Sequence, residues 1–246
     1  MSGHFESHFP ESGSVDYADQ SSSIDDVAIA ELRELAGRYP QARSALLPML
    51  HLVQSVDGRI SPRGIEVCAD ILGISTAQVS GVATFYTMYK RRPAGKHHLG
   101  VCTTALCAVM GGDTLLQRVK DRLGIDENQT TPCGRVSLER LECNAACDYA
   151  PVMMVNWEFF DNMDPAKTDQ LVERLLNDEE VVSSRGAILT SWREAERVLA
   201  GFPDGRADEG PSAGPASLAG VEIARENNWS APKPATLAAT VKEEAK

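Results

Sequence analysis

Basic residues are scarce in this sequence. Its 246 residues include 24 Lys and Arg against 35 Asp and Glu, which gives a formal net charge of -11 at pH 7. Proteins that bind nucleic acid rely on Lys and Arg to neutralise phosphates, so this acidic chain is a poor candidate for that role. Hydrophobic residues (43%) and charged residues (24%) occur in ordinary proportions, and they predict a globular protein with a substantial core.

The sequence also lacks a long hydrophobic run. Its longest uncharged stretch, 71–89, is interrupted by Ser, Thr and Gln residues, whereas a membrane-spanning helix needs ~20 predominantly apolar residues. Residues 1–23 hold no Lys, no Arg and no apolar run, so they do not resemble a signal peptide. We therefore expect a cytosolic chain with no direct membrane insertion.

Motifs for nucleotide binding are missing as well. Neither Gly-x-Gly-x-x-Gly nor Gly-x₄-Gly-Lys-Ser/Thr occurs, and Gly95-Lys96 is followed by His97. Any NADH or flavin chemistry is therefore expected on another chain. No Ser/His/Asp arrangement can be argued, and we predict no catalytic residues. His97 and His98 precede a predicted strand and are expected at the surface rather than as metal ligands.

Residues 24–95 predict a small helical bundle. Apolar residues recur at helical spacing, and the turns between them are short. Ser61 followed by Pro62 is typical of a helix start. Ser75 with Gln78 forms a capping box for the next helix.

From residue 96 to 182 the hydrophobic pattern changes. Short apolar segments at 99–102, 136–141 and 152–155 predict strands, and helical patterns follow at 115–123 and after Asp164-Pro165. This order of strand, helix, strand, strand and helix predicts a small α/β layer structure with an open sheet.

The two ends of the chain differ from this core. Residues 1–23 are polar and acidic and predict a disordered tail. Residues 183–246 predict an extension with one short helix, followed by a tail rich in Pro, Ala and Gly. That tail is expected either to stay disordered or to become ordered on a partner, and four apolar residues favour the second: Leu218, Val221, Ile223 and Trp229.

Four of the six cysteines form two close pairs. Cys102 and Cys107 are separated by four residues, and Cys143 and Cys147 by three. Each pair lies at the end of a predicted strand, where the loops of open α/β sheets carry functional sites. The residues between the cysteines are mostly small, so backbone N–H groups can approach four thiolates. That arrangement suits a [2Fe–2S] cluster.

Spacing alone does not separate this cluster from a structural zinc ion. Zinc also binds four cysteines supplied by Cys-x₂₋₄-Cys pairs. A thioredoxin-like dithiol is disfavoured because no Cys-x-x-Cys motif occurs. Six cysteines are too few for a disulfide scaffold.

Three further residues near this pattern have other expected roles. Cys68 falls on the apolar face of a predicted helix and is expected in the core. Cys133 lies in a Thr-Pro-Cys-Gly turn and is expected to be exposed or half-buried, with substitution for another ligand as a minor alternative. Glu142 is either a surface acid, which we favour, or a local modulator of the potential of the cluster.

Three segments taken together point to a known family. They are VATFYTMY at 82–89, VCT at 101–103 leading to Cys107, and ECNAACDYAP at 142–151. In combination they resemble the NuoE-type subunit of respiratory complex I, the NADH–quinone oxidoreductase. The resemblance covers about residues 24–180.

The resemblance implies an α+β fold, in which an N-terminal helical bundle precedes a thioredoxin-like α/β ferredoxin domain. It implies one [2Fe–2S] cluster with Cys102, Cys107, Cys143 and Cys147 as its four ligands. The chain would exchange single electrons with FMN on a NuoF-type partner that also binds NADH, and a NuoG-type iron–sulfur subunit would lie nearby. The cluster would lie close to the flavin but off the main electron path to quinone.

The same resemblance implies a place in the peripheral arm, on the cytoplasmic side of the plasma membrane. There the chain would be a subunit of a proton-translocating NADH:quinone oxidoreductase, with no independent catalysis. This module is also expected in NAD-linked hydrogenases and formate dehydrogenases, which the sequence of this chain separates poorly from complex I.

One loop departs from the family pattern. The family commonly has Leu-Gly-Ala between the second pair of cysteines, where this chain has Asn144-Ala145-Ala146. Alanine at 145 costs little if its φ is negative and more if its φ is positive. Asn144 could add a hydrogen bond near a sulfur, so the reduction potential depends on this loop.

Overall fold

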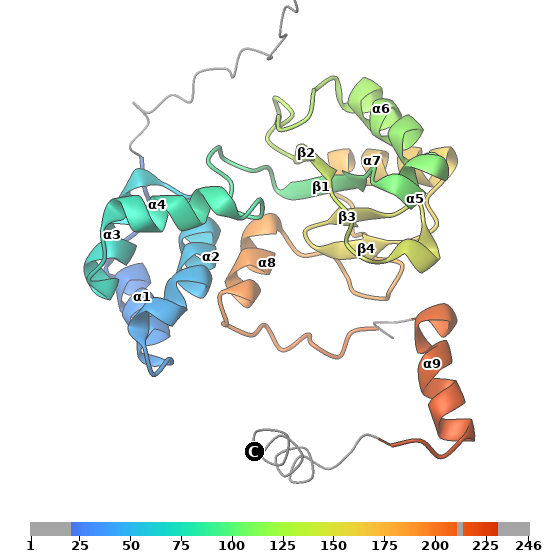
Figure 1. The fold of residues 1–246 in the computed structure, drawn as a ribbon. Coiled ribbons are helices and arrows are strands. Elements are labelled where there is room, and N and C mark those ends of the chain that lie inside the picture. The colour runs from blue at the N-terminus through green and yellow to red at the C-terminus, as the bar shows by residue number, and fades with distance from the viewer. Residues whose placement is uncertain (1–20, 211–213, 231–246) are drawn as a thin grey trace, which may run out of the picture.

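A computed structural model describes residues 21–210 and 214–230. Its N-terminal part holds four helices, in agreement with the helical bundle expected there (Figure 1). They are α1 (Asp26–Gly37), α2 (Leu46–Asp57, preceded by a 3₁₀ turn at Ala42–Ala45), α3 (Pro62–Leu72) and α4 (Thr76–Phe85). Most of the tail expected over 1–23 lies outside the described residues.

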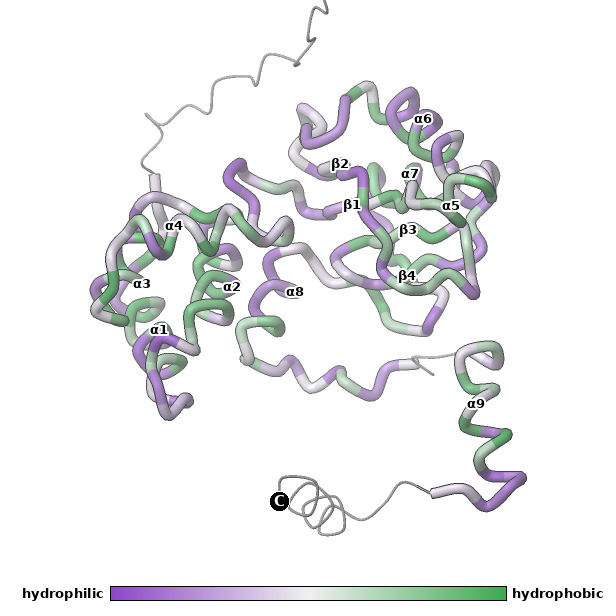
Figure 2. The backbone as a smooth tube through the Cα atoms, viewed as in Figure 1, coloured by the Kyte–Doolittle hydropathy of each residue, from purple (hydrophilic) through white to green (hydrophobic). Residues whose placement is uncertain are grey.

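Local capping explains where α3 and α4 begin. The Ser61 hydroxyl accepts a hydrogen bond from the Gly64 N–H, and Ser75 forms the expected reciprocal capping box with Gln78. The four helices share one hydrophobic core, and Figure 2 shows hydrophobic residues over much of α2. The largest fully buried side chains of this core are Leu32, Leu35, Met49, Leu50 and Leu52.

A four-stranded mixed sheet follows, with the strand order β2-β1-β3-β4. Strand β1 (His97–Cys102) pairs in parallel with β2 (Val136–Leu141) and antiparallel with β3 (Met153–Val155), which pairs with β4 (Glu158–Phe160). Helices α6 (Gly112–Leu123) and α7 (Pro165–Asn177) pack against each other and share a core with the strands. The sequence predicts all of these elements except β4.

Helix α8 (Trp192–Leu199) lies between the sheet and α2. Its Glu196 is fully buried, and its carboxylate contacts three side chains. Nε2 of Gln54 and Nε1 of Trp157 donate to it at 2.8 and 3.0 Å, and Nδ1 of His51 lies 2.6 Å away. This buried contact fixes the helical part of the chain against the sheet.

The described part of the extension, 183–210 and 214–230, contains two helices where one short helix was expected. Helix α9 (Pro215–Glu226) has no buried residues and follows α8 (Figure 1). It meets the rest of the chain near its first turn, where the Ser217 hydroxyl donates to the Asp148 carboxylate (2.7 Å) and the Ala216 N–H donates to the Tyr149 hydroxyl (3.3 Å).

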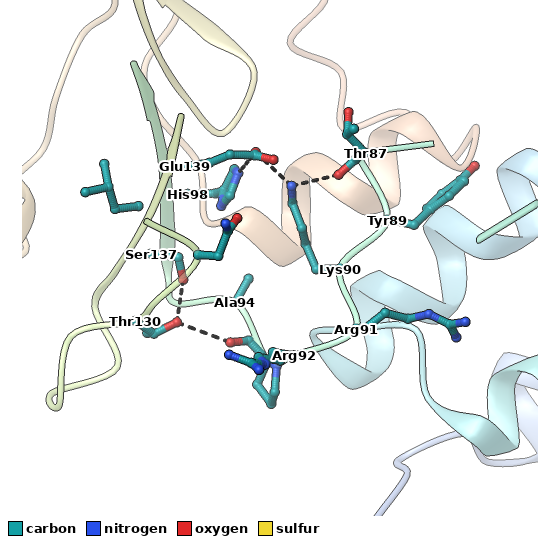
Figure 3. Close-up of a pocket in the computed structure, with 13 residues that line it drawn as sticks. Thr87, Tyr89, Lys90, Arg91, Arg92, Ala94, His98, Thr130, Ser137 and Glu139 are labelled. Carbon is teal, nitrogen blue, oxygen red and sulfur yellow. Dashed lines mark hydrogen bonds and ion pairs between the residues drawn. The ribbon is translucent and has the colours of Figure 1, made fainter. Parts of the chain in front are cut away.

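His97 and His98 are buried, and the expectation that they lie at the surface was wrong. They are 5% and 6% exposed. The cause is tertiary, because α8 brings the Trp192 ring to 4.8 Å from the His98 ring. Nε2 of His98 lies 2.7 Å from the Glu139 carboxylate, which also accepts from Nζ of Lys90 at 2.7 Å (Figure 3).

Among the described residues, no single helix is long and apolar enough to cross a membrane. Helices α3 and α4 meet the length and composition criteria only when they are taken together, and they are bent by 119° at the break between them.

Candidate metal centre

The four paired cysteines come from two loops at one edge of the sheet. β1 ends at Cys102, and the short helix α5 (Ala105–Val109), which the sequence analysis missed, carries Cys107. β2 ends at Leu141, just before Cys143, and Cys147 begins a 3₁₀ turn. Because β1 and β2 are parallel, with Cys102 opposite Leu141, both loops leave the sheet at the same edge.

All four cysteines line one small cavity together with Asn144, Ala146 and Val152. Cys102 and Cys107 are buried, whereas Cys143 and Cys147 are exposed. The Sγ atoms of Cys143 and Cys147 lie 3.5 Å apart. Two thiolates on one tetrahedral metal, with metal–sulfur bonds of about 2.3 Å, would be about 3.7 Å apart. The second pair is therefore spaced to bind one metal atom.

In the described part of the chain, no three His, Cys, Asp or Glu side chains are arranged to hold a single metal ion. The four cysteines instead face the cavity as two pairs, one from each loop.

Burial and neighbouring thiols disfavour free thiolates in this cavity. Burial raises the pKa of Cys107 to about 11, and the adjacent Cys102 adds to the shift. The hydrogen bond to Cys143 raises the pKa of Cys147. A bound metal must displace these protons, so metal binding would release protons to solvent.

Backbone N–H groups point at the sulfurs of both loops. The Ala145 N–H donates to the Sγ of Cys143 at 3.3 Å, and the backbone of Val152 forms a hydrogen bond that lowers the pKa of Cys107. Such donors stabilise the negative charge of thiolate ligands and set the reduction potentials of iron–sulfur clusters. The donor set and its surroundings therefore fit a [2Fe–2S] cluster.

Ala145 adopts a left-handed backbone conformation with a φ of 58°. From the sequence, an alanine at this position was expected to cost little at negative φ and more at positive φ. The positive φ applies, so the alanine destabilises the loop. A residue with a Cβ atom pays about 1–2 kcal/mol in this region, whereas glycine does not. The loop keeps this geometry despite the departure from the family pattern.

The other residues singled out in the sequence are not among those that line the cavity. Cys68 is buried in the helical core as expected, and burial raises the pKa of its thiol to about 12. Cys133 is exposed, and its Sγ lies 3.3 Å from the Thr131 hydroxyl, which lowers the pKa of the thiol. Glu142 is exposed next to Cys143, in agreement with the favoured surface role.

Sequence reasoning missed two residues that shape the site. Val152 closes the cavity, but its position in an apolar run predicted only a strand. Gly112 begins α6 at a very close approach, because a Cβ atom there would lie 2.5 Å from the Cys102 carbonyl oxygen and 2.8 Å from that of Cys107. The adjacent glycines at 111 and 112 are the signal in the sequence that could have pointed to this close approach.

Comparisons with known proteins point to the same family as the sequence motifs. The family model for the thioredoxin-like [2Fe–2S] ferredoxin matches residues 32–176. The chain is 53% identical over 203 residues to the E subunit of the NADH-quinone oxidoreductase of Mycobacterium tuberculosis (strain H37Rv), covering 82% of this chain and 81% of that one. It is 38% identical over 153 residues to an E subunit of the NADH-quinone oxidoreductase of Rhizobium meliloti, covering 62% of this chain and 91% of that one.

A solved structure shares the fold. The NAD+-reducing [NiFe]-hydrogenase in its air-oxidized state matches with a TM-score of 0.50 and 19% identity, over 54% of this chain and 23% of that chain. At this identity the match concerns the fold alone.

The matched family model and the cysteine-lined cavity together indicate a protein of the ferredoxin class. The chain belongs to the thioredoxin-like [2Fe–2S] ferredoxin family. The resemblance to NuoE-type subunits drawn from the sequence is confirmed, and so is the α+β fold that it implied.

Proposed function

We propose that this chain is the electron-transferring [2Fe–2S] subunit of an NADH–quinone oxidoreductase. The observation that carries the proposal is the convergence of Cys102, Cys107, Cys143 and Cys147 on one cavity. The relatives that are named as E subunits of NADH-quinone oxidoreductases support the choice of complex. When bound, the cluster would accept and release one electron at a time.

Each part of the site has a role in this proposal. The four thiolates would hold the two irons, one pair from each loop. The N–H groups of Ala145 and Val152 would stabilise the negative charge on the sulfurs. The buried side of Cys102 and Cys107 excludes water, whereas the exposed side of Cys143 and Cys147 leaves a route for electrons to a partner.

The partner in this proposal is a NuoF-type subunit that binds FMN and NADH, with a NuoG-type subunit nearby on the cytoplasmic side of the membrane. The chain itself contains no recognisable nucleotide motif. Apolar side chains on and next to α5 are exposed close to Cys107, and they offer a surface for such a partner: Leu106, Val109 and Met110.

The competing functions have less support. A structural zinc site would use the same four cysteines, but the matched family is described as a [2Fe–2S] ferredoxin. A hydrogenase role rests on a likeness of fold alone.

Serine variants of the cysteines test the assignment of the ligands. We expect Cys102→Ser and Cys143→Ser to abolish or strongly reduce bound iron and sulfide after anaerobic purification. Cys133→Ser is the matched control, because Cys133 is also exposed but lies outside the cavity lining. Full iron and sulfide content in the Cys143 variant would contradict the proposed ligand set.

Affinity purification tests the proposed partner. The tagged full-length chain, co-expressed with the neighbouring genes of its own genome, should recover a second chain that contains FMN. Recovery of this chain without a flavoprotein would contradict the proposed complex while leaving the cluster assignment intact.

A further inference from the structure

Arg140 links three elements that surround the cysteine cavity. It lies on β2, opposite Val101 of β1 and three residues before Cys143. Its Nε donates to the hydroxyl of Thr103 at 2.6 Å, and its Nη2 donates to the Asp113 carboxylate at 2.9 Å. One side chain therefore connects the strand that leads to the second cysteine pair with the loop of the first pair and with α6.

The Thr103 contact lies directly beside a candidate ligand. Thr103 follows Cys102, and its N–H donates to the Leu141 carbonyl at 3.4 Å, at the point where the β1–β2 pair ends. The guanidinium of Arg140 adds a side-chain link at this same place. It therefore opposes separation of the two cysteine loops as they leave the sheet.

The contact of Arg140 with Asp113 supports the first cysteine pair through the start of α6. Asp113 lies in the first turn of α6, next to Gly112. The start of that helix packs so closely on the carbonyl groups of Cys102 and Cys107 that a Cβ atom on Gly112 would clash with both. The ion pair between Arg140 and Asp113 thus fixes the helix start that supports the first cysteine pair.

The guanidinium of Arg140 also places a positive charge beside the two cysteine loops. A [2Fe–2S] cluster with four thiolates is negative, and reduction adds one more negative charge. A nearby cation favours the reduced state and raises the reduction potential, whereas a nearby carboxylate lowers it. Arg140 and Asp113 are both about half exposed, so salt should screen their effects.

We propose that Arg140 is a positioning residue of the candidate cluster: it ties the two cysteine loops together and raises the reduction potential of the cluster. Asp113 holds the guanidinium in place and offsets part of its charge. The inference rests on the proposed [2Fe–2S] cluster, and the spacing of the cysteines does not by itself require an arginine at this position.

The test is a redox titration, monitored by EPR, of the anaerobically purified full-length chain at low ionic strength. Arg140→Gln should shift the midpoint potential to a more negative value, and Asp113→Asn should shift it to a more positive value. Arg140→Lys, which keeps the charge, should restore most of the wild-type potential. Both shifts should shrink when salt is raised to 1 M.

Arg118→Gln is the matched control. Arg118 has a similar exposure and also forms an ion pair, with Asp169 at 2.6 Å, but this pair joins α6 to α7 and not to a cysteine loop. The midpoint potential of the cluster in the Arg118→Gln variant should equal that of the wild type.

Shifts of the same sign in the Arg140 and Asp113 variants, or no shift in either, would overturn the inference. If Arg140→Gln fails to retain the cluster, Asp113→Asn still decides, because a purely structural ion pair predicts no positive shift. Failure of the wild-type chain to assemble a cluster would overturn the proposed function as well, so the two failures are distinguishable.

Discussion

The backbone N–H of Ala145 donates to the Sγ of Cys143 at 3.3 Å from a left-handed conformation. The Cβ atom of alanine is strained in that conformation, because a left-handed φ brings it close to the backbone. The loop therefore holds a strained residue directly beside a candidate ligand.

Ala145→Gly should stabilise the chain. Glycine adopts the same φ without strain, and part of the gain is lost to its greater freedom in the unfolded state. We expect the free energy of unfolding to rise by about 1 kcal/mol, measured by denaturant titration of the cluster-loaded chain.

The neighbouring alanine is the control for this change. Ala146 has a negative φ of -98°, so the freedom of glycine at positive φ brings no gain there. Ala146→Gly should therefore lower the free energy of unfolding by about 1 kcal/mol. Destabilisation by both glycine variants would contradict the assignment of strain to Ala145.

Cysteine alkylation should distinguish the free thiols from the proposed ligands. In the cluster-loaded chain, Cys133 should react readily with iodoacetamide, because it is exposed and the Thr131 hydroxyl lowers the pKa of its thiol. Cys68 should resist, because burial raises its pKa to about 12. Mass spectrometry of the labelled peptides gives the result.

The same labelling reports on the exposed ligand pair. Cys143 and Cys147 should be protected in the loaded chain and become reactive once a chelator removes the metal. Equal labelling of these two cysteines before and after metal removal would argue against their role as ligands.

Glu196→Ala should strongly destabilise the fold. The change leaves Gln54 and Trp157 without the buried acceptor to which they donate, and it removes the carboxylate beside His51. We expect a loss of about 3 kcal/mol, measured by denaturant unfolding.

Glu34→Ala is the comparison for the buried glutamate. Glu34 is more than half exposed and pairs with Arg38 one helical turn away. Exposed pairs of this kind contribute about 0.5 kcal/mol or less. A similarly small effect of Glu196→Ala would show that α8 does not depend on this contact.

Stability should fall as the pH drops below about 6.5. Burial lowers the pKa of His98 below the ordinary value of 6.5, although Glu139 opposes the shift. The unfolded chain therefore binds more protons in this range, and the native state loses stability as the pH falls.

Glu139 extends this loss to lower pH. Burial raises the pKa of Glu139, but His98 and Lys90 together lower it below 4.5. The stability that the ionised Glu139 contributes above that pH is therefore lost on further acidification.

The test of the His98 contribution is the free energy of unfolding, measured from pH 7.5 to 5.5. It should depend less on pH in His98→Gln than in the wild type. Identical slopes would contradict the role of His98.

The elements that could be predicted from the sequence are those whose ends are marked by residues close by in the chain. Ser61 and Ser75 mark the starts of α3 and α4 through caps made by nearby residues. The cysteine pairs were recognisable because each follows a strand directly. These signals lie within a few residues of the features that they specify.

Features that depend on distant contacts could not be predicted. His98 is buried because Trp192, far along the chain, covers it. β4 has only three residues, and it follows a turn at Asn156 and Trp157 with positive φ at both positions, a conformation unusual for tryptophan. The contact of Arg140 with Thr103 and Asp113 needs the parallel pairing of β1 and β2, which no local pattern specifies.

The most direct test of the account is EPR spectroscopy of the anaerobically purified full-length chain, combined with assays of iron, sulfide and zinc. The account predicts about two irons and two acid-labile sulfides per chain, with an EPR signal that is absent in the oxidised protein and appears on reduction. Stoichiometric zinc, with no sulfide and no signal on reduction, would contradict it and indicate a structural zinc protein.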